Sequence, residues 1–289
     1  MNSKNKLAEM PIRPLLYTMA VPLMLSLLVQ SLYNIVDSIF VARLSETALT
    51  AASLVYSIQF LMIAVGVGTA VGLKNYHFMW QDVADIYRVG LPTIIMQAIG
   101  SIMTFVVNRI LLDVSATAVA FFGIYYKLQN FLMMPINGLG QAAIPIVGYN
   151  YGDKNYQRVH QTWKILLPTG AIIALCGTVI FWCFPGQLLQ LFSASSEMLL
   201  LGIPALRIIS ISFVMSAITI LCGYFSSGLG NGIINMVGAA IRQLILLVPC
   251  LWIFIKISGI SHGWYAFWIA EIIACIYSYC MSHKLLKTI

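Results

Sequence analysis

Long apolar runs, separated by short polar or basic turns, follow one another along this chain. Eight of them are long enough to cross a hydrocarbon layer of about 30 Å, which takes about 20 helical residues. The eight runs are Leu15–Val41, Ala48–Gly72, Val89–Leu112, Ala118–Tyr149, Ile165–Phe184, Met198–Tyr224, Ile233–Ile257 and Trp264–Met281. Because backbone amides in lipid must be paired, and barrel strands are half this length, the pattern predicts an all-α polytopic membrane protein with eight transmembrane helices.

Composition agrees with this prediction. Hydrophobic residues make up 60% of the chain and charged residues 9%, against about 25% charged in a soluble domain. The sequence holds no HExxH, GxSxG or phosphate-binding GxxxxGK motif. An isolated HxxxxD, from His77 to Asp82, is a weak motif for an acyltransferase. We therefore predict neither an enzyme nor a bound cofactor, and the six cysteines, none in CxxC spacing, predict no metal or disulfide.

The distribution of positive charge predicts the orientation in the membrane. Three cations fall on one side of the eight spans, namely Arg43, Arg109 and Lys256. Ten fall on the other side: Lys4, Lys6, Arg13, Lys74, Arg88, Lys154, Arg158, Lys164, Lys284 and Lys287. The positive-inside rule then places both termini in the cytoplasm of a multi-pass protein of the plasma or inner membrane. The net charge of +7 is explained by topology, so no nucleic-acid partner is expected.

An internal repeat predicts how the spans are organised. Residues 17–68 are similar to residues 87–138, with ten identical pairs such as Pro22/Pro92 and Gly68/Gly138. An even number of crossings separates the copies, so they are parallel repeats. Four more spans follow the second copy and none follows the first. We therefore predict a truncated two-helix N-lobe (1–72), a cytoplasmic or interfacial linker (73–88) and a six-helix C-lobe (89–289).

Polar residues recur on one face of each repeat's first helix. Span 1 carries Ser26, Gln30, Asn34 and Asp37 at helical spacing, and span 3 carries Gln97, Ser101, Thr104 and Asn108. Polar groups in lipid normally face a bundle interior or a water-filled cavity. The two stripes predict a central cavity, and hydrogen bonding between neighbouring helices is the alternative.

Two intramembrane carboxylates are candidates for chemistry. Asp37 is the only acid of span 1 and is a candidate for ion coupling, with a solvated carboxylate at the interface as the alternative. Glu271 lies in the last span. Lys127 and Arg242 are its conceivable charge partners, and pairing competes with a role in transport.

The fourth span combines prolines and glycines in an unusual way. Met134–Gln141, followed by Pro145 and Gly148, is expected to bend or break the helix and to free carbonyls near Asn137 and Gln141. Broken helices at membrane depth often line substrate sites. A simple packing kink is the other interpretation. Together these arguments predict a cavity lined by Gln30, Asn34, Gln97, Ser101, Asn108, Lys127, Asn137, Gln141 and Glu271.

The run Met134–Val159 (MPINGLGQAAIPIVGYNYGDKNYQRV) closely resembles the eighth helix and following loop of MATE-family multidrug and toxic-compound extrusion transporters. Gly90-Leu91-Pro92 is similar to the start of their seventh helix, and Asn34–Leu44 to the end of their first. The resemblance implies two six-helix lobes around a cleft and exchange of H⁺ or Na⁺ for bulky, mostly cationic drugs. It assigns ion coupling to Asp37, with Na⁺ near this residue as one option.

The resemblance also implies an internal gap. It covers helices one and two and resumes before helix seven, so helices three to six are missing, with a seam near Gly72–Asn75. The usual neighbours of Asp37 on helices five and six are then absent. Three functions stay open: an exporter of organic cations, completed by a homodimer; a remnant that inserts but does not transport; and a lipid-linked saccharide flippase. The span cations Lys127, Arg207 and Arg242 keep the flippase open.

Overall fold

The computed structural model describes residues 6–44, 95 and 98–289 of the chain. Every regular element in this part is a helix. The elements are α1 (Lys6–Glu9), α2 (Ile12–Leu44), the helix Ala98–Leu112, α5 (Ala116–Gly152), α6 (Tyr156–Cys183), α7 (Pro185–Gln190), α8 (Ser196–Ser210), α9 (Phe213–Gly228), α10 (Gly232–Ala240), the π-helix η1 (Ile241–Leu247), α11 (Val248–Ser258), α12 (Ile260–Gly263) and α13 (Ala266–Lys287).

Six membrane spans can be recognised by length and composition in the described residues. Five are single helical stretches: Ile12–Arg43, Ala116–Gly152, Tyr156–Cys183, Gly232–Ser258 and Ile260–Lys287. The sixth is the pair α8 and α9, which meet at an angle of 49°. These correspond to six of the eight predicted runs, and the all-α polytopic class is confirmed. Of the other two runs, Val89–Leu112 is described chiefly as Ala98–Leu112, and Ala48–Gly72 lies outside the described residues.

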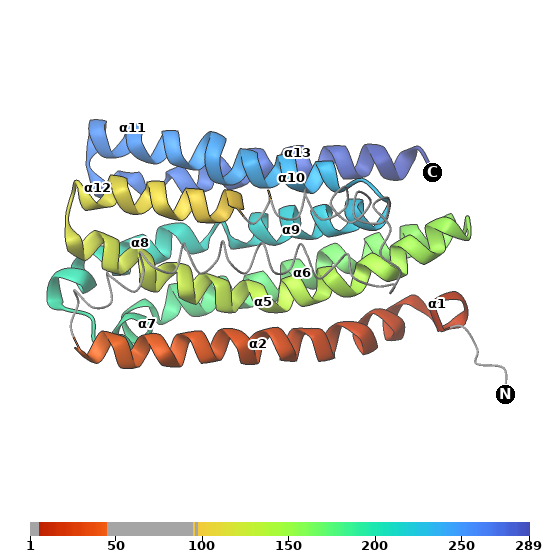
Figure 1. Cartoon of the computed structure of the whole chain (residues 1–289), viewed down its shortest axis with the longest axis horizontal. Coiled ribbons are helices and arrows are strands. Elements are labelled where there is room, and N and C mark those ends of the chain that lie inside the picture. The colour runs from red at the N-terminus through yellow and green to blue at the C-terminus, as the bar shows by residue number, and fades with distance from the viewer. Residues whose placement is uncertain (1–5, 45–94, 96–97) are drawn as a thin grey trace, which may run out of the picture.

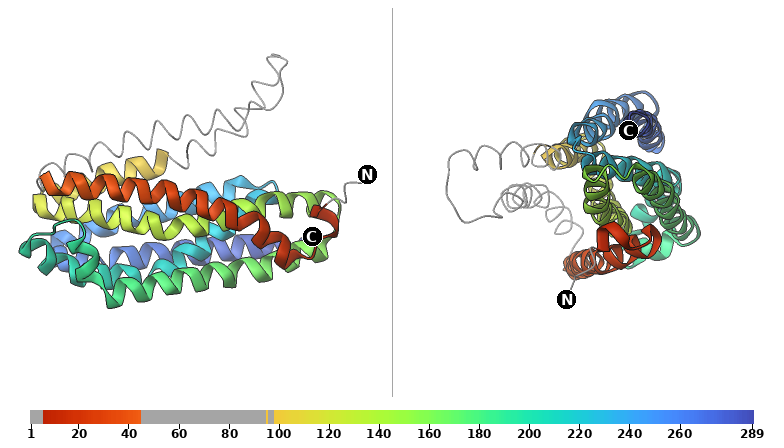
Figure 2. Two further views of the ribbon diagram at one scale, coloured as in Figure 1. Left: turned by 90° about the horizontal axis from the view of Figure 1, so that it is seen from below. Right: turned by 90° about the vertical axis from the view of Figure 1, so that its right-hand side faces the viewer.

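The long helices run side by side along one axis (Figure 1). The helix α2 and the helix Ala98–Leu112, which begin the two predicted repeats, run in the same direction, and α5 runs opposite to both. The helix α1 and the end of α13 lie at the same end of the bundle. Seen along the axis, α2 and α13 lie toward opposite edges, with α5, α6 and α9 between them (Figure 2).

The centre of the bundle is α5, which packs against α2, α6, α8 and α9. A methyl group on Gly138 would lie 2.8 Å from both the backbone N and the Cα of Met24, so α2 and α5 approach each other closely here. Small residues allow such approach in lipid, where packing and not exclusion of water holds helices together. Near the N-terminal end of α5, the rings of Phe121 and Trp264 pack edge to face, with their centroids 5.1 Å apart.

The fourth span was predicted to bend or break, and a break does not occur. The helix α5 is continuous over 37 residues, through both Pro135 and Pro145. A proline removes one hydrogen bond from a helix, and tight packing on several neighbours can hold the rest of the helix in place. The irregular backbone lies elsewhere, at the bend between α8 and α9 and in the π-helix η1, which ends just before Pro249.

Arg158 ties the N-terminal turn to the end of the bundle. Most of the polar stretch between Asn150 and Lys164 extends α5 and α6, and only a short turn at 153–155 separates the two helices. Arg158 Nε donates to Asn150 Oδ1 at 2.7 Å, and its Nη2 donates to the carbonyls of Leu7 (2.9 Å) and Met10 (2.7 Å). We call Leu7, Met10, Asn150 and Arg158 the Arg158 clamp.

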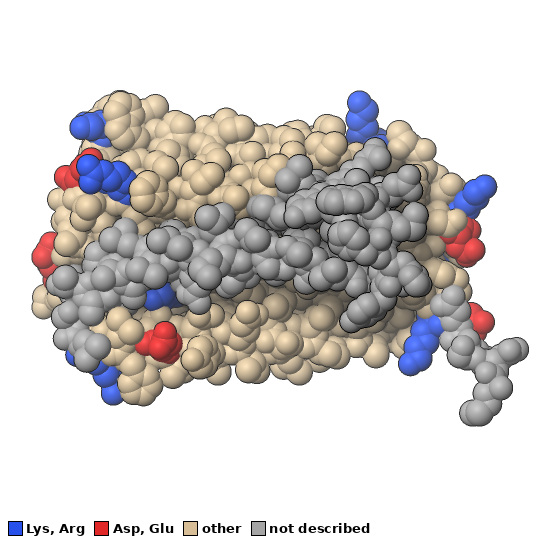
Figure 3. Space-filling model, in the orientation of Figure 1, with Lys and Arg blue, Asp and Glu red and all other residues tan. Residues whose placement is uncertain are grey.

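Charged side chains are arranged as a membrane protein requires. On the face in Figure 3, the described Lys, Arg, Asp and Glu side chains gather toward the two ends of the long axis, and the tan surface visible between them shows none. The predicted interfacial linker, with His77 and Asp82, lies outside the described residues.

Candidate functional site: a polar cavity between the helices

A cavity of about 410 Å³ opens between α2, the helix Ala98–Leu112, α5, α9, α10, η1 and α13. Carboxamides, methionines and aromatic residues make up most of its lining. Eight are carboxamides: Gln30, Asn34, Gln129, Asn130, Asn137, Gln141, Asn235 and Gln243. The methionines are Met103, Met133 and Met134, and the aromatic residues are Phe122, Tyr126, Tyr224 and Phe267.

One face of α5 forms a wall of the cavity. Tyr126, Asn130, Asn137 and Gln141 follow at intervals of four or seven residues, which keeps them on one side of the helix. Tyr224, from α9, donates a hydrogen bond from its hydroxyl to Asn137 Oδ1 at 3.2 Å. This bond fixes the orientation of the Asn137 carboxamide, which faces the cavity and would otherwise be free to rotate.

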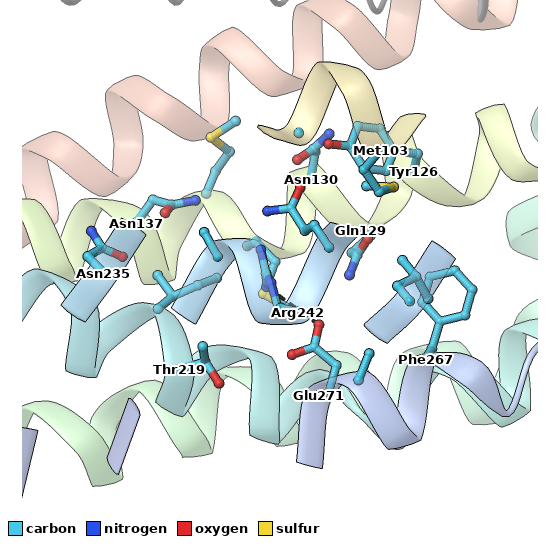
Figure 4. A pocket seen from close by; sticks show the side chains of 18 of the residues that line it. Met103, Tyr126, Gln129, Asn130, Asn137, Thr219, Asn235, Arg242, Phe267 and Glu271 are labelled. Atoms are coloured by element: carbon cyan, nitrogen blue, oxygen red, sulfur yellow. Dashed lines mark hydrogen bonds and ion pairs between the residues drawn. The ribbon is translucent and has the colours of Figure 1, made fainter. Parts of the chain in front are cut away.

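The second wall contains an ion pair. Arg242 of η1 and Glu271 of α13 point toward each other (Figure 4), with Arg242 Nη1 3.5 Å from Glu271 Oε1. The side chains of Arg242 and Glu271 keep 20% and 7% of their surface exposed. The second carboxylate oxygen, Glu271 Oε2, is buried without a hydrogen-bond partner among the described residues. Arg242 is the single cation and Glu271 the single anion among the described residues that line the cavity.

The structure brings five of the nine predicted cavity residues to the cavity: Gln30, Asn34, Asn137, Gln141 and Glu271. Gln97 lies outside the described residues. Ser101 and Asn108 are buried in the helix Ala98–Leu112 but do not line the cavity. Ser101 Oγ and both amide atoms of Asn108 have no hydrogen-bond partner among the described residues.

The conceivable pairing of Lys127 with Glu271 does not occur, because Arg242 occupies that place. Lys127 is 8% exposed and does not line the cavity. Its ammonium instead interacts electrostatically with Asp37 of α2. Asp37 is exposed and also lies off the cavity wall.

The third intramembrane cation is used in a local contact. Arg207 Nε donates to the carbonyl of Trp182 at 3.3 Å, and Trp182 Nε1 donates to the carbonyl of Arg207 at 3.1 Å. These paired bonds join the end of α6 to α8, and they leave Arg207 away from the cavity.

Sequence reasoning missed several residues of the site. Gln129, Asn130, Asn235 and Gln243 line the cavity but were not predicted to do so. Arg242 was considered as a charge partner and as a span cation compatible with a flippase, but it was not among the predicted cavity residues. The signal was present, because each is a polar residue inside an apolar span, and such residues face a cavity or a neighbour. Many span residues are polar, however, and the sequence does not show which of them face the cavity until it is known which helices pack together.

Long helices aligned along one axis, with a polar cavity between them, define a polytopic membrane protein with the architecture of a secondary transporter. The family model MatE matches residues 22–76 and 92–253, well over half of the chain. The chain therefore belongs to the MatE family of membrane transporters, which are not enzymes, and the predicted resemblance is confirmed.

Curated relatives and solved structures agree with this assignment. "Multidrug export protein MepA" of Staphylococcus haemolyticus is 28% identical over 190 residues, which are 65% of this chain and 41% of that protein. The protein of the same name from Staphylococcus saprophyticus is 26% identical over 195 residues, 66% of this chain and 42% of that protein. This chain thus matches about two fifths of the length of these relatives.

Among solved structures, "Inward-facing conformation of a multidrug resistance MATE family transporter of the MOP superfamily" superposes with a TM-score of 0.67. It is 22% identical, and the match covers 75% of this chain and 50% of that one. "Crystal structure of MATE in complex with MaL6" gives a TM-score of 0.68 at 22% identity, covering 75% and 49%. These likenesses establish the MATE fold of the chain.

Proposed function

We propose that this chain acts as a MATE-type secondary transporter that binds bulky organic cations, including drugs, and exports them in exchange for H⁺ or Na⁺. The cavity is the observation that supports this most directly. Its volume of about 410 Å³ falls in the range of drug-sized sites, about 300–1,000 Å³. Flexible methionines adapt to different shapes, and aromatic faces attract cations. Relatives named as multidrug export proteins point the same way.

The proposal includes unequal lobes: a two-helix N-lobe (1–72), a linker (73–88) and a C-lobe (89–289). The second stretch matched by the MatE model is about three times as long as the first. The parallel course of α2 and the helix Ala98–Leu112 also fits two repeats. Since the short lobe leaves one side of the cleft without protein, a homodimer would complete the wall.

The orientation is proposed with both termini in the cytoplasm. Two observations support it. The helix α1 and the end of α13 lie at the same end of the bundle, and the sequence places most of the interfacial cations on this side. The positive-inside rule makes that side cytoplasmic.

Asp37 is proposed as the coupling carboxylate. It is the acid that corresponds to the coupling residue in the resemblance, and in this fold it interacts electrostatically with Lys127. Asp37→Asn keeps the size and removes the exchangeable charge, so efflux driven by a pH or Na⁺ gradient should be lost while dye binding to the purified protein persists. Retained gradient-driven efflux would remove Asp37 from the mechanism.

Whole-cell efflux of a cationic dye tests the function itself. The chain is expressed in cells without other drug pumps, and its amount in the membrane is measured alongside efflux. Normal expression without efflux would favour the non-transporting remnant. The flippase is disfavoured, because the described cavity wall carries one cation, Arg242, and Glu271 offsets its charge.

A further inference from the structure

The ion pair in the cavity leaves much of its bonding capacity unused. Charge-assisted bonds between Arg and carboxylate are usually about 2.7–2.9 Å and often bidentate, whereas Arg242 Nη1 and Glu271 Oε1 are 3.5 Å apart. A guanidinium presents five N–H donors. Arg242 makes no other hydrogen bond to the described residues, and Glu271 Oε2 makes none.

The groups around the carboxylate do not compensate for this. Tyr125 and Cys275 lie close enough to interact electrostatically with Glu271, and both are uncharged groups. The Ser216 hydroxyl of α9 interacts with the carboxylate as a side-chain hydrogen-bonding group, but the same hydroxyl also donates to the carbonyl of Ser212 at 3.3 Å. An unpartnered carboxylate oxygen that is more than nine-tenths buried is destabilising unless a further group binds it. A ligand in the cavity can supply that group.

The charges on the wall select among ligands. A compound with positive charge alone would gain a contact with Glu271 but would be repelled by Arg242, which lies beside it. A compound with negative charge alone would be attracted by Arg242 but repelled by Glu271. A molecule that carries an ammonium and a carboxylate can bind both residues and replaces one long internal contact by two intermolecular ones. Such pairing of charges provides specificity more than affinity.

We propose that Arg242 and Glu271 form a two-charge binding site that selects zwitterionic substrates over compounds with positive charge alone. The substrate ammonium binds Glu271 Oε2, and its carboxylate binds the free N–H groups of Arg242. The carboxamides and aromatic rings of the cavity hold the uncharged body of the molecule. This inference rests on the proposed export function and specifies its substrate class and the residues that recognise it.

A matched pair of dyes tests the selection. A rhodamine with a free benzoic carboxylate and its methyl ester share the same cationic ring system, and the open form of the acid carries a negative charge that the ester lacks. Binding of each to the full chain in lipid nanodiscs is measured by fluorescence polarisation. The wild-type chain should bind the free acid about tenfold more tightly than the ester, a difference of about 1.4 kcal/mol.

Two single variants should move this ratio in opposite directions. Arg242→Gln leaves Glu271 unopposed, so the ester should become the tighter ligand. Glu271→Gln leaves Arg242 unopposed, so the preference for the acid should increase. Arg242→Lys, which keeps the charge, should preserve the sign of the preference, and Arg207→Gln, a span cation off the cavity, should leave the ratio unchanged.

The outcomes separate the two proposals. If both dyes bind but the ratio is near one, or shifts in the same direction in both single variants, the zwitterion site is wrong and the export function stands. If neither dye binds to the wild-type chain, both proposals fail. Each variant is compared only when it elutes as a single species in size-exclusion chromatography, and Arg242→Lys serves as the folded reference.

Discussion

The Arg158 clamp should decide how firmly the first turn is held to the bundle. Arg158 makes three hydrogen bonds of 2.7–2.9 Å, two of them to the carbonyls of Leu7 and Met10. Charge-assisted bonds contribute about 1.5–3 kcal/mol each. The acceptors are partly accessible, so water replaces part of what is lost. We therefore expect Arg158→Gln to weaken the attachment of α1 by about 3 kcal/mol.

Hydrogen exchange measures this loss directly. A cost of about 3 kcal/mol increases local opening about a hundredfold, so amides of the peptide Lys6–Leu16 should exchange about a hundred times faster at short labelling times, while peptides of α9 and α13 stay unchanged. Lys164→Gln is the matched control, because Lys164 is an exposed cation of α6. Equal protection of Lys6–Leu16 in Arg158→Gln and wild type would refute the reasoning.

Two further predictions concern packing and topology. Gly138→Val should force α2 and α5 apart, since even a Cβ would lie 2.8 Å from the backbone of α2. Overpacking of this kind costs about 1–3 kcal/mol, so the midpoint of thermal unfolding in detergent should fall by several degrees. Gly152→Ala, where a Cβ meets nothing within 4 Å, should leave it unchanged, and an equal drop would contradict the packing argument. In a cysteine-free background, Lys154→Cys should react with an impermeant maleimide only from the cytoplasmic side and Asp113→Cys only from outside; the reverse labelling would invert the proposed topology.

Six of the membrane spans and the periodicity of polar residues along the first helix could be read from the sequence. Gln30 and Asn34 both line the cavity because a helix of 3.6 residues per turn puts positions four apart on one face, and lipid excludes polar groups from the other faces. Proline was a weaker guide. Pro135 and Pro145 were expected to bend or break α5, and the helix is not broken, since a proline's local cost can be offset by packing along the rest of the helix.

The apolar runs, the repeat and the distribution of charge were therefore determined by the sequence, because hydrophobic length and charge placement act on each segment separately. Which charges meet was decided by the tertiary structure. Lys127 and Arg242 were equal candidates for Glu271, and only the packing of η1 beside α13 joins Arg242 to Glu271 and leaves Lys127 near Asp37. Periodicity defines the face on which a side chain lies, but the partner depends on which helix packs against that face and at what height.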